Sequence, residues 1–161
     1  MSIKSQLNNI NLNKVKINGK PIKTILKEET DRLYRCIQFY IDEYYTTYKP
    51  KVYDRTYRFQ GAMYVENFLD IKIIGNTIQL QIKFNDDLAM HDSIYDNGVG
   101  YVPVLINDGW CWKGWGNKPE DHFHKYSGYH FIEKGIADFN RLNPYHIRIN
   151  VEKIYKGKRY N

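Results

Sequence analysis

Residues 21–47 read PIKTILKEETDRLYRCIQFYIDEYYTT and carry the longest regular pattern of the chain. Apolar side chains recur there at steps of three and four, the spacing that gathers them on one side of an α-helix. They are Ile22, Leu26, Leu33, Ile37, Tyr40, Ile41 and Tyr44. Pro21 suits the first helical turn, where a backbone N–H has no partner inside the helix. The pattern predicts a long amphipathic helix over residues 21–47.

The helix leads into an aromatic and basic segment, residues 44–56, with the sequence YYTTYKPKVYDRT. Pro50 cannot continue a helix and biases Lys49 toward an extended backbone, so the helix should end near Thr47 or Tyr48. Tyrosine is enriched in protein–protein interfaces, and the chain has 15 of them. The segment shows no recognisable catalytic chemistry, and we interpret it as a surface that packs against another protein.

The first 20 residues of the chain are polar and rich in asparagine, and Asn18-Gly19 is a strong turn signal. They fit either a small hairpin or an extended arm that orders only against a neighbour. We favour the arm, because the segment buries little on its own. We expect neither a signal peptide nor a membrane span, because no stretch approaches the roughly 20 apolar residues that a span needs.

After the aromatic segment, the sequence predicts a β-hairpin over residues 68–84. Its second half, residues 78–84, alternates strictly between apolar and polar side chains, and Gly75-Asn76 fits a tight two-residue turn. One face of this hairpin should pack on the long helix.

Residues 85–128 form the least regular part of the sequence. They suggest an acidic and glycine-bearing loop, a short strand over residues 101–106, and a glycine- and tryptophan-rich turn region over residues 107–118. A second helix is predicted over residues 129–142, where an Asn-Pro pair stops it, and a final strand over residues 145–151.

These elements predict the α+β class, with the long N-terminal amphipathic helix packed on a small, mainly antiparallel β-sheet and a second short helix near the C-terminus. The length of 161 residues fits one domain. We divide the chain into an N-terminal arm (1–20), a single α+β domain (21–155) and a basic tail (156–161).

The net charge is +6, and the excess of lysine lies near the two ends of the chain. This balance permits nucleic-acid or acidic-protein partners without deciding between them. The two cysteines have no CxxC spacing, which favours a reduced setting over a disulfide framework. Cys36 is expected to be a small core residue of the long helix.

The strongest case for an enzyme is a group of histidines and one cysteine between residues 91 and 130. No second Cys or His pair stands at a zinc-like spacing, and the acidic loop lacks the order of a calcium-binding loop. The common nucleotide-binding, hydrolase and metallopeptidase motifs are missing. We therefore predict no catalytic residue, no cofactor and no bound metal, with a zinc-dependent enzyme as the weakest alternative.

Three tryptophans, Trp110, Trp112 and Trp115, cluster beside lysine and glycine. Their rings can stack on bases or sugars, or they can cap the core or contact an adjacent subunit. We favour the second reading, because tryptophan is enriched among the anchor residues of protein interfaces.

The order of the parts resembles the tail-completion (neck, or head–tail joining) proteins of long-tailed bacteriophages and prophages. In that family, an aromatic or small residue, a proline and an Arg-Thr or Thr-Gly pair end the first helix, and a Phe-hydrophobic-x-x-Ala/Gly-hydrophobic helix follows near the C-terminus. The matching stretches here are Tyr48-x-Pro50-x-x-Tyr53-x-Arg55-Thr56 and Gly128-Tyr-His-Phe131-Ile132-x-x-Gly135-Ile136.

The resemblance implies a non-enzymatic structural virion protein that is assembled in the host bacterial cytoplasm. It implies a ring, usually of six or twelve subunits, between the portal-side connector and the tail tube or tail terminator. Non-specific proximity to packaged DNA stays open, and a small basic nucleic-acid-binding protein is the main alternative. The expected contacts between subunits or with partners are Tyr44, Tyr48, Pro50, Tyr53, Arg55, Trp110, Trp112 and Trp115.

Overall fold

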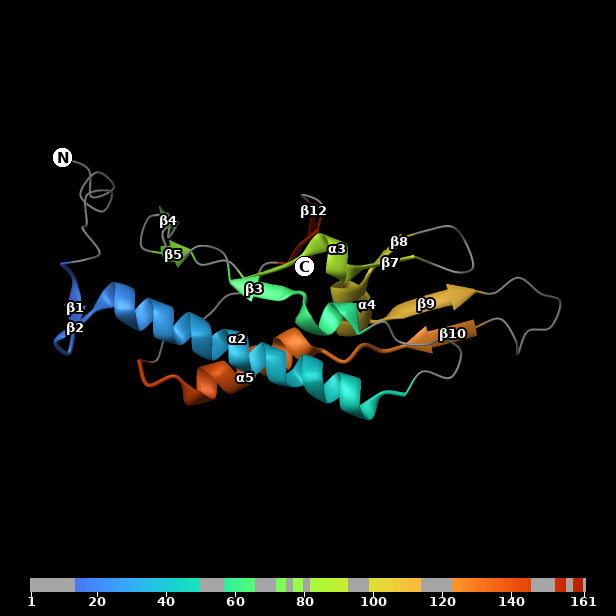
Figure 1. Ribbon diagram of the computed structural model, residues 1–161, viewed down its shortest axis with the longest axis horizontal. Helices are drawn as coiled ribbons and strands as arrows, with labels where there is room; N and C mark the ends of the chain where they lie inside the picture. Colours follow the sequence, from blue (N-terminus) through green and yellow to red (C-terminus); the bar gives the residue numbers. More distant parts are fainter. Residues whose placement is uncertain are drawn as a thin grey trace.

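The computed structural model shows an α+β protein in which two helices, α2 and α5, lie side by side with short antiparallel strand pairs around them (Figure 1). The residues that the structure describes are 14–49, 57–65, 72–74, 77–79, 82–92, 99–113, 123–145, 153–155 and 158–160. Pro50, Tyr53, Arg55 and Trp115 lie outside these residues.

Helix α2 spans Ile22–Thr47, with Pro21 at its N-cap and Tyr48 at its C-cap. The predicted helix and its end near Thr47 are therefore confirmed. The Tyr48 backbone is extended, as expected of a chain that approaches Pro50, and its N–H still donates to the Tyr44 carbonyl oxygen at 2.9 Å.

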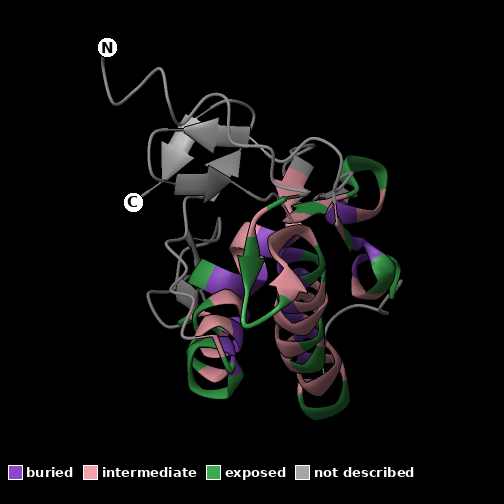
Figure 2. Ribbon diagram, turned by 90° about the vertical axis from the view of Figure 1, so that its left-hand side faces the viewer, coloured by how far each residue is buried: buried purple, intermediate pink, exposed green. Residues whose placement is uncertain are grey.

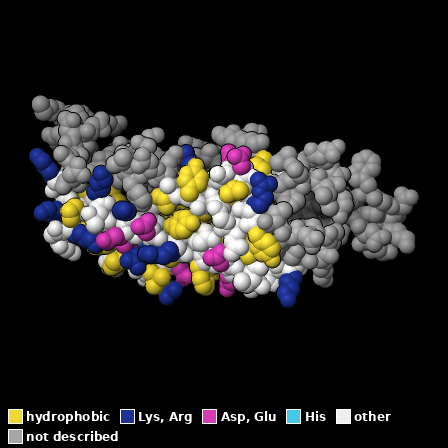
Figure 3. Space-filling view, viewed as in Figure 1, with side chains coloured by type: hydrophobic (Ala, Val, Ile, Leu, Met, Phe, Trp, Pro, Cys, Tyr) yellow, Lys and Arg dark blue, Asp and Glu magenta, His cyan; other side chains and the backbone are white. Residues whose placement is uncertain are grey.

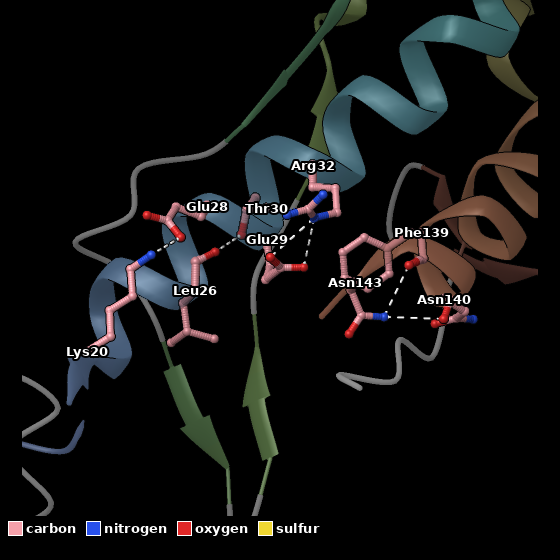
Figure 4. Close-up of polar contacts among 9 residues, drawn as sticks. All are labelled: Lys20, Leu26, Glu28, Glu29, Thr30, Arg32, Phe139, Asn140 and Asn143. Carbon is pink, nitrogen blue, oxygen red and sulfur yellow. Dashed lines mark hydrogen bonds and ion pairs between the residues drawn. The ribbon is translucent and has the colours of Figure 1, made fainter. Parts of the chain in front are cut away.

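Helix α5 spans Phe131–Leu142, close to the prediction of 129–142. It begins two residues late because His130 adopts the left-handed conformation, with a φ of 57°. It ends at Asn143, whose side-chain nitrogen donates to the Phe139 carbonyl oxygen at 3.1 Å (Figure 4). The Asn143 backbone N–H donates to the same carbonyl oxygen at 2.9 Å, so two donors of Asn143 close the last turn of the helix.

The main packing contact of the fold joins α2 to α5, which run in opposite directions (Figure 1). Gly135 makes their close approach possible: a Cβ atom there would lie 2.7 Å from Ile37 Cγ1 and 2.8 Å from Ile37 Cα. Because Ile37 presents its backbone here, a larger residue at position 135 would force the helices apart.

The core lies between these helices and the residues that follow α2 (Figure 2). Its buried members come from several separate segments of the described chain: Ile37, Ile41, Tyr44, Phe59, Ala62, Met63, Ala89, Ile106 and Phe131. Cys36, expected in the core, is only partly buried, although burial is the main cause that raises the pKa of its thiol.

The strands form six antiparallel pairs of two strands each in the described residues. The pairs are β1 (Lys16–Ile17) with β2 (Lys20–Pro21), β3 (Met63–Val65) with β6 (Ile82–Phe84), β4 (Lys72–Ile74) with β5 (Thr77–Gln79), β7 (Met90–Asp92) with β8 (Val99–Tyr101), β9 (Trp110–Lys113) with β10 (Phe123–Tyr126), and β11 (Lys153–Tyr155) with β12 (Lys158–Tyr160). A short 3-10 helix η1 (Arg58–Gly61) and helices α3 (Asp86–Ala89) and α4 (Val102–Asp108) complete the elements.

The hairpin predicted over residues 68–84 is confirmed only around its turn. Ile74 and Thr77 are partners on either side of Gly75-Asn76, as predicted. The two described parts of the run 78–84 have different partners, however, because β5 pairs with β4 and β6 pairs with β3, where Met63 lies opposite Phe84. Alternation fixes the face of a strand but not its partner.

Three other predictions of local structure are wrong. Residues 101–106 are not a strand, because most of them belong to α4, whose first turn contains Pro103. The predicted turn region 107–118 contains strand β9. The preference for an extended arm over a hairpin is wrong for residues 16–21, which form a hairpin at Asn18-Gly19, whereas residues 1–13 lie outside the described residues. Most of the predicted strand 145–151 lies outside the described residues, and β12 falls within the basic tail.

Candidate interaction surface at the end of helix α2

Six tyrosine rings surround the C-terminal end of α2, and we call them the tyrosine cluster: Tyr44, Tyr45, Tyr48, Tyr57, Tyr126 and Tyr129. Tyr44 is at the centre. Its ring stacks on Tyr48 with a centroid distance of 5.2 Å and meets the edge of Tyr129 at 5.4 Å. Such aromatic pairs stabilise by about 0.5–1.5 kcal/mol beyond the area that they bury.

Tyr44 is 6% exposed, so the prediction that it forms part of an exposed contact surface is wrong. Its position on the apolar side of the helix, three residues after Ile41, explains its burial. Tyr48 is half-buried between Tyr44 and Tyr126, with a centroid distance of 5.9 Å to the latter. Tyr57, which the sequence did not single out, is 57% exposed and is the most open ring of the cluster.

The backbone of Trp110 lies beside this cluster. In the β9–β10 pair Trp110 is the partner of Tyr126, whose ring contacts Tyr48, and Trp112 is the partner of His124. The structure thus brings two of the predicted contact segments together, one after α2 and one in β9. For Trp110 and Trp112 the backbone alone is described.

Polar contacts connect the cluster to α5. The Tyr129 hydroxyl donates to Glu43 Oε2, and Lys134 Nζ lies 3.5 Å from the Tyr129 ring centroid. Burial, followed by the hydrogen bond to Glu43, raises the pKa of Tyr129 to about 12. The arrangement holds Tyr129 as a neutral donor between the helices.

One turn away, Tyr40 repeats this arrangement with Asp138. The Tyr40 hydroxyl donates to Asp138 Oδ2 at 2.8 Å, and this bond raises the pKa of Tyr40. The hydrogen bond from Arg141, and then that from Tyr40, lowers the pKa of Asp138. Sequence reasoning missed the two tyrosine–carboxylate pairs, because their members are 86 and 98 positions apart.

Asn107 fixes the start of α5 and so the position of Tyr129. It is 1% exposed, and its Oδ1 accepts a hydrogen bond of 2.8 Å from the Ile132 backbone N–H. Its Nδ2 donates to Asp108 Oδ1 at 2.7 Å and to Glu133 Oε2 at 2.9 Å. A residue of α4 therefore caps α5, whose own N-cap residue, His130, makes no side-chain cap.

Two glycines allow this close contact between chain segments. Gly109 and Gly128 both have φ values near the left-handed region, +89° and +86°. A Cβ atom on Gly109 would lie 2.2 Å from the Tyr126 carbonyl oxygen. Glycine at both positions lets the end of α4 lie against the segment that carries Tyr126 and Tyr129.

Within the described part of the chain, no three His, Cys, Asp or Glu side chains gather in a way that could hold a metal ion. No helix there combines the length and apolar character that crossing a membrane requires. The groups that the cluster offers are aromatic rings, an ammonium group over one of these rings and one exposed tyrosine, Tyr57.

No family model, no curated protein and no solved structure matches this chain.

Proposed function

We propose that the chain is a non-enzymatic structural protein of a phage or prophage particle. In this proposal it resembles the tail-completion proteins in role as well as in motif order. It forms a ring of six or twelve subunits at the head–tail junction, between the portal-side connector and the tail tube or tail terminator. It is assembled in the host bacterial cytoplasm and becomes part of the virion.

The observation that carries the proposal is the meeting of the two stretches on which the resemblance rests. Tyr48 opens the first stretch and Tyr129 belongs to the second, and both rings contact Tyr44. The stretches are about 80 positions apart in sequence. Their shared contact with Tyr44 offers a structural reason for both motifs to occur in one chain.

The second stretch also has a packing role at two of its positions. Phe131 is fully buried, and Gly135 is the point where α5 touches Ile37 of α2. Position 135 needs glycine, because even the Cβ atom of an alanine would lie 2.7 Å from Ile37 Cγ1; this agrees with the Gly of the family pattern but not with its Ala. In this proposal, the packing of the second stretch supports the first stretch.

The proposed contact surface is revised by these observations. Tyr44 is assigned to the core, and Tyr57 is added because more than half of its side chain is exposed. The surface then comprises Tyr48, Pro50, Tyr53, Arg55, Tyr57, Trp110, Trp112 and Trp115. As part of the same proposal, the strand pairs β3–β6 and β4–β5 belong to one small sheet beneath α2.

Two measurements test the proposal. A phage or prophage that lacks the gene should make heads and tails that remain separate, and supplying the chain should restore joined, infectious particles. Native mass spectrometry of the chain with its connector should give a complex with six or twelve copies. Infectious particles in the absence of the chain, together with no affinity for any structural protein of the phage, would contradict the proposal.

A matched pair of variants tests whether the contact surface lies at the tyrosine cluster. Tyr57→Ala should weaken ring formation, because it removes the most open ring of the cluster. Tyr64→Ala removes a tyrosine of similar exposure, 44%, from strand β3 and should leave assembly unchanged. Equal effects of the two substitutions would show that the ring contact is not at the tyrosine cluster.

A further inference from the structure

The opposite end of the molecule has a different chemistry. Residues 14–27, which we call the basic end, contain five lysines and no aspartate or glutamate. They form the β1–β2 hairpin and the start of α2, about 39 Å from the other end of that helix at 1.5 Å per residue. Side chains in the dark blue of Lys and Arg gather over this end, at the left of Figure 3.

The hairpin holds its lysines on a defined backbone. Asn18 and Gly19 have φ values of +51° and +81°, the left-handed pair that a tight two-residue hairpin turn requires. The Ile22 N–H donates to the Val15 carbonyl oxygen at 2.8 Å and joins the hairpin to the helix. Lys14 and Lys16 are exposed on it.

Acidic residues compensate only part of this charge. Lys20 pairs with Glu28, and Arg32 lies 3.2 Å from both carboxylate oxygens of Glu29, one turn further along (Figure 4). Lys14 and Lys16 are exposed on the hairpin, so the hairpin keeps a positive charge beyond that of the paired Lys20.

The basic end lacks the features of a protein interface. It contains no tyrosine, tryptophan, phenylalanine or arginine, although 16% of the chain is aromatic. Interfaces between proteins are enriched in those residues and depleted in lysine. The aromatic cluster at the other end of α2 has the composition that the basic end lacks.

The basic end also lacks the features of a membrane-binding helix. Such a helix inserts an apolar face beneath its basic face. Here the apolar face of the first turns is already covered, because Ile25 is 1% and Leu26 is 7% exposed. Ile17 is the one large exposed hydrophobic side chain of the described basic end.

We propose that the basic end binds the phosphate backbone of duplex DNA without reading its sequence. Lysine is a compact point charge that suits phosphate contacts, and a two-stranded ribbon fits against a groove. The choice of duplex DNA as the partner rests on the proposed function, since packaged DNA passes through the head–tail junction. Contacts with about four phosphates would give a slope of log affinity against log salt of about −3 to −4.

The test measures binding of the full chain to fluorescent duplexes of two unrelated sequences between about 50 mM and 200 mM salt. Lys16→Gln/Lys23→Gln removes two charges from the basic end. Arg35→Gln/Lys49→Gln removes two charges from exposed positions further along α2 and beyond it, and gives the same net charge. Circular dichroism verifies the helix content of each variant.

We expect equal affinity for both sequences. The Lys16/Lys23 variant should bind about tenfold or more weakly at low salt and lose about two units of salt slope, while the control changes by no more than about twofold. Equal losses in the two variants, tighter binding to anionic lipid vesicles or to an acidic polypeptide than to DNA, or no binding to DNA, would each overturn the inference.

The outcomes for DNA and for assembly are separable. A chain that joins heads to tails but does not bind duplex DNA overturns this inference and leaves the proposed function standing. A chain that binds DNA but neither assembles nor restores particles overturns the proposed function, and is then a free nucleic-acid-binding protein.

Discussion

The two ends of helix α2 differ in whether their polar side chains are hydrogen-bonded inside the fold or exposed to solvent. At the C-terminal end, tyrosine hydroxyls and carboxylates are joined in pairs such as Tyr129–Glu43, and one ring, Tyr44, is buried among others. At the N-terminal end, lysines extend from a hairpin into solvent. Composition alone therefore does not identify a surface: most tyrosines near the C-terminal end help to build the fold, whereas Lys14 and Lys16 at the N-terminal end are exposed.

The largest expected effect is the loss of the central ring. Tyr44→Ala removes a buried aromatic side chain and should lower the free energy of unfolding by about 3–5 kcal/mol, as other buried aromatic truncations do. Tyr64→Ala, at a 44% exposed ring, should cost less than about 1 kcal/mol. Urea unfolding measures both. Similar losses would mean that Tyr44 is not a core residue.

The close helix contact gives the next effect. Gly135→Ala adds a Cβ atom 2.8 Å from Ile37 Cα, a backbone atom that cannot rotate away. The free energy of unfolding should fall by about 1–3 kcal/mol, the usual cost of overpacking. The control is Gly61→Ala, where a Cβ atom meets nothing within 4 Å. If the two alanines behave alike in thermal unfolding, the α2–α5 contact is looser than described.

Loss of the Asn107 cap of α5 should have a similar or slightly smaller effect on the free energy of unfolding. Asn107→Ala leaves the Ile132 N–H without its acceptor and should lower the free energy of unfolding by about 2 kcal/mol. Asn140→Ala, at an exposed position within α5, should be neutral or stabilising, because alanine favours a helix. Chemical denaturation of the two variants checks the difference, and a neutral Asn107→Ala would contradict the capping role.

Alkaline pH should weaken the hydrogen bond between Tyr129 and Glu43 at the C-terminal end of α2. Because the pKa of Tyr129 is raised to about 12, its stabilising effect is complete below its ordinary value near 10 and is lost as the pH rises toward 12. Glu43→Gln removes the charged acceptor and should lower the pKa of Tyr129. A tyrosine-absorbance titration should show this component move to lower pH in the variant. An unchanged titration would argue against the Tyr129–Glu43 bond.

The smallest expected effect comes from the basic end. Lys16→Gln/Lys23→Gln should change the free energy of unfolding by no more than about 0.5 kcal/mol, or raise it slightly through weaker self-repulsion. Thermal unfolding measures this change. A loss of more than about 1 kcal/mol would show that these lysines support the fold.

Periodicity predicted the helices but not what lies against them. The three- and four-residue steps of α2 placed Tyr44 on the apolar face, and this was a better guide than the interface tendency of tyrosine. The short apolar run after Tyr101 fits a strand or a helix equally well. Pro103 in the first turn and Gly109 at the C-cap are the features that favour a helix, α4. The general α+β class and both main helices were within reach of the sequence.

The contacts that build the candidate surface were not predictable in this way. The cap of α5 comes from Asn107, more than 20 positions before the helix, so the capping rules for adjacent residues do not find it. The pairing of β6 with β3 and the register of Trp110 with Tyr126 are equally non-local. Such pairings depend on packing and not on local pattern.

Electron cryomicroscopy of purified particles that carry this chain would show where it lies. We expect a ring of six or twelve copies at the head–tail junction, with the tyrosine-cluster end of α2 at a contact between subunits or with a neighbouring protein. Particles whose head–tail junction is complete but contains no copy of the chain would contradict it.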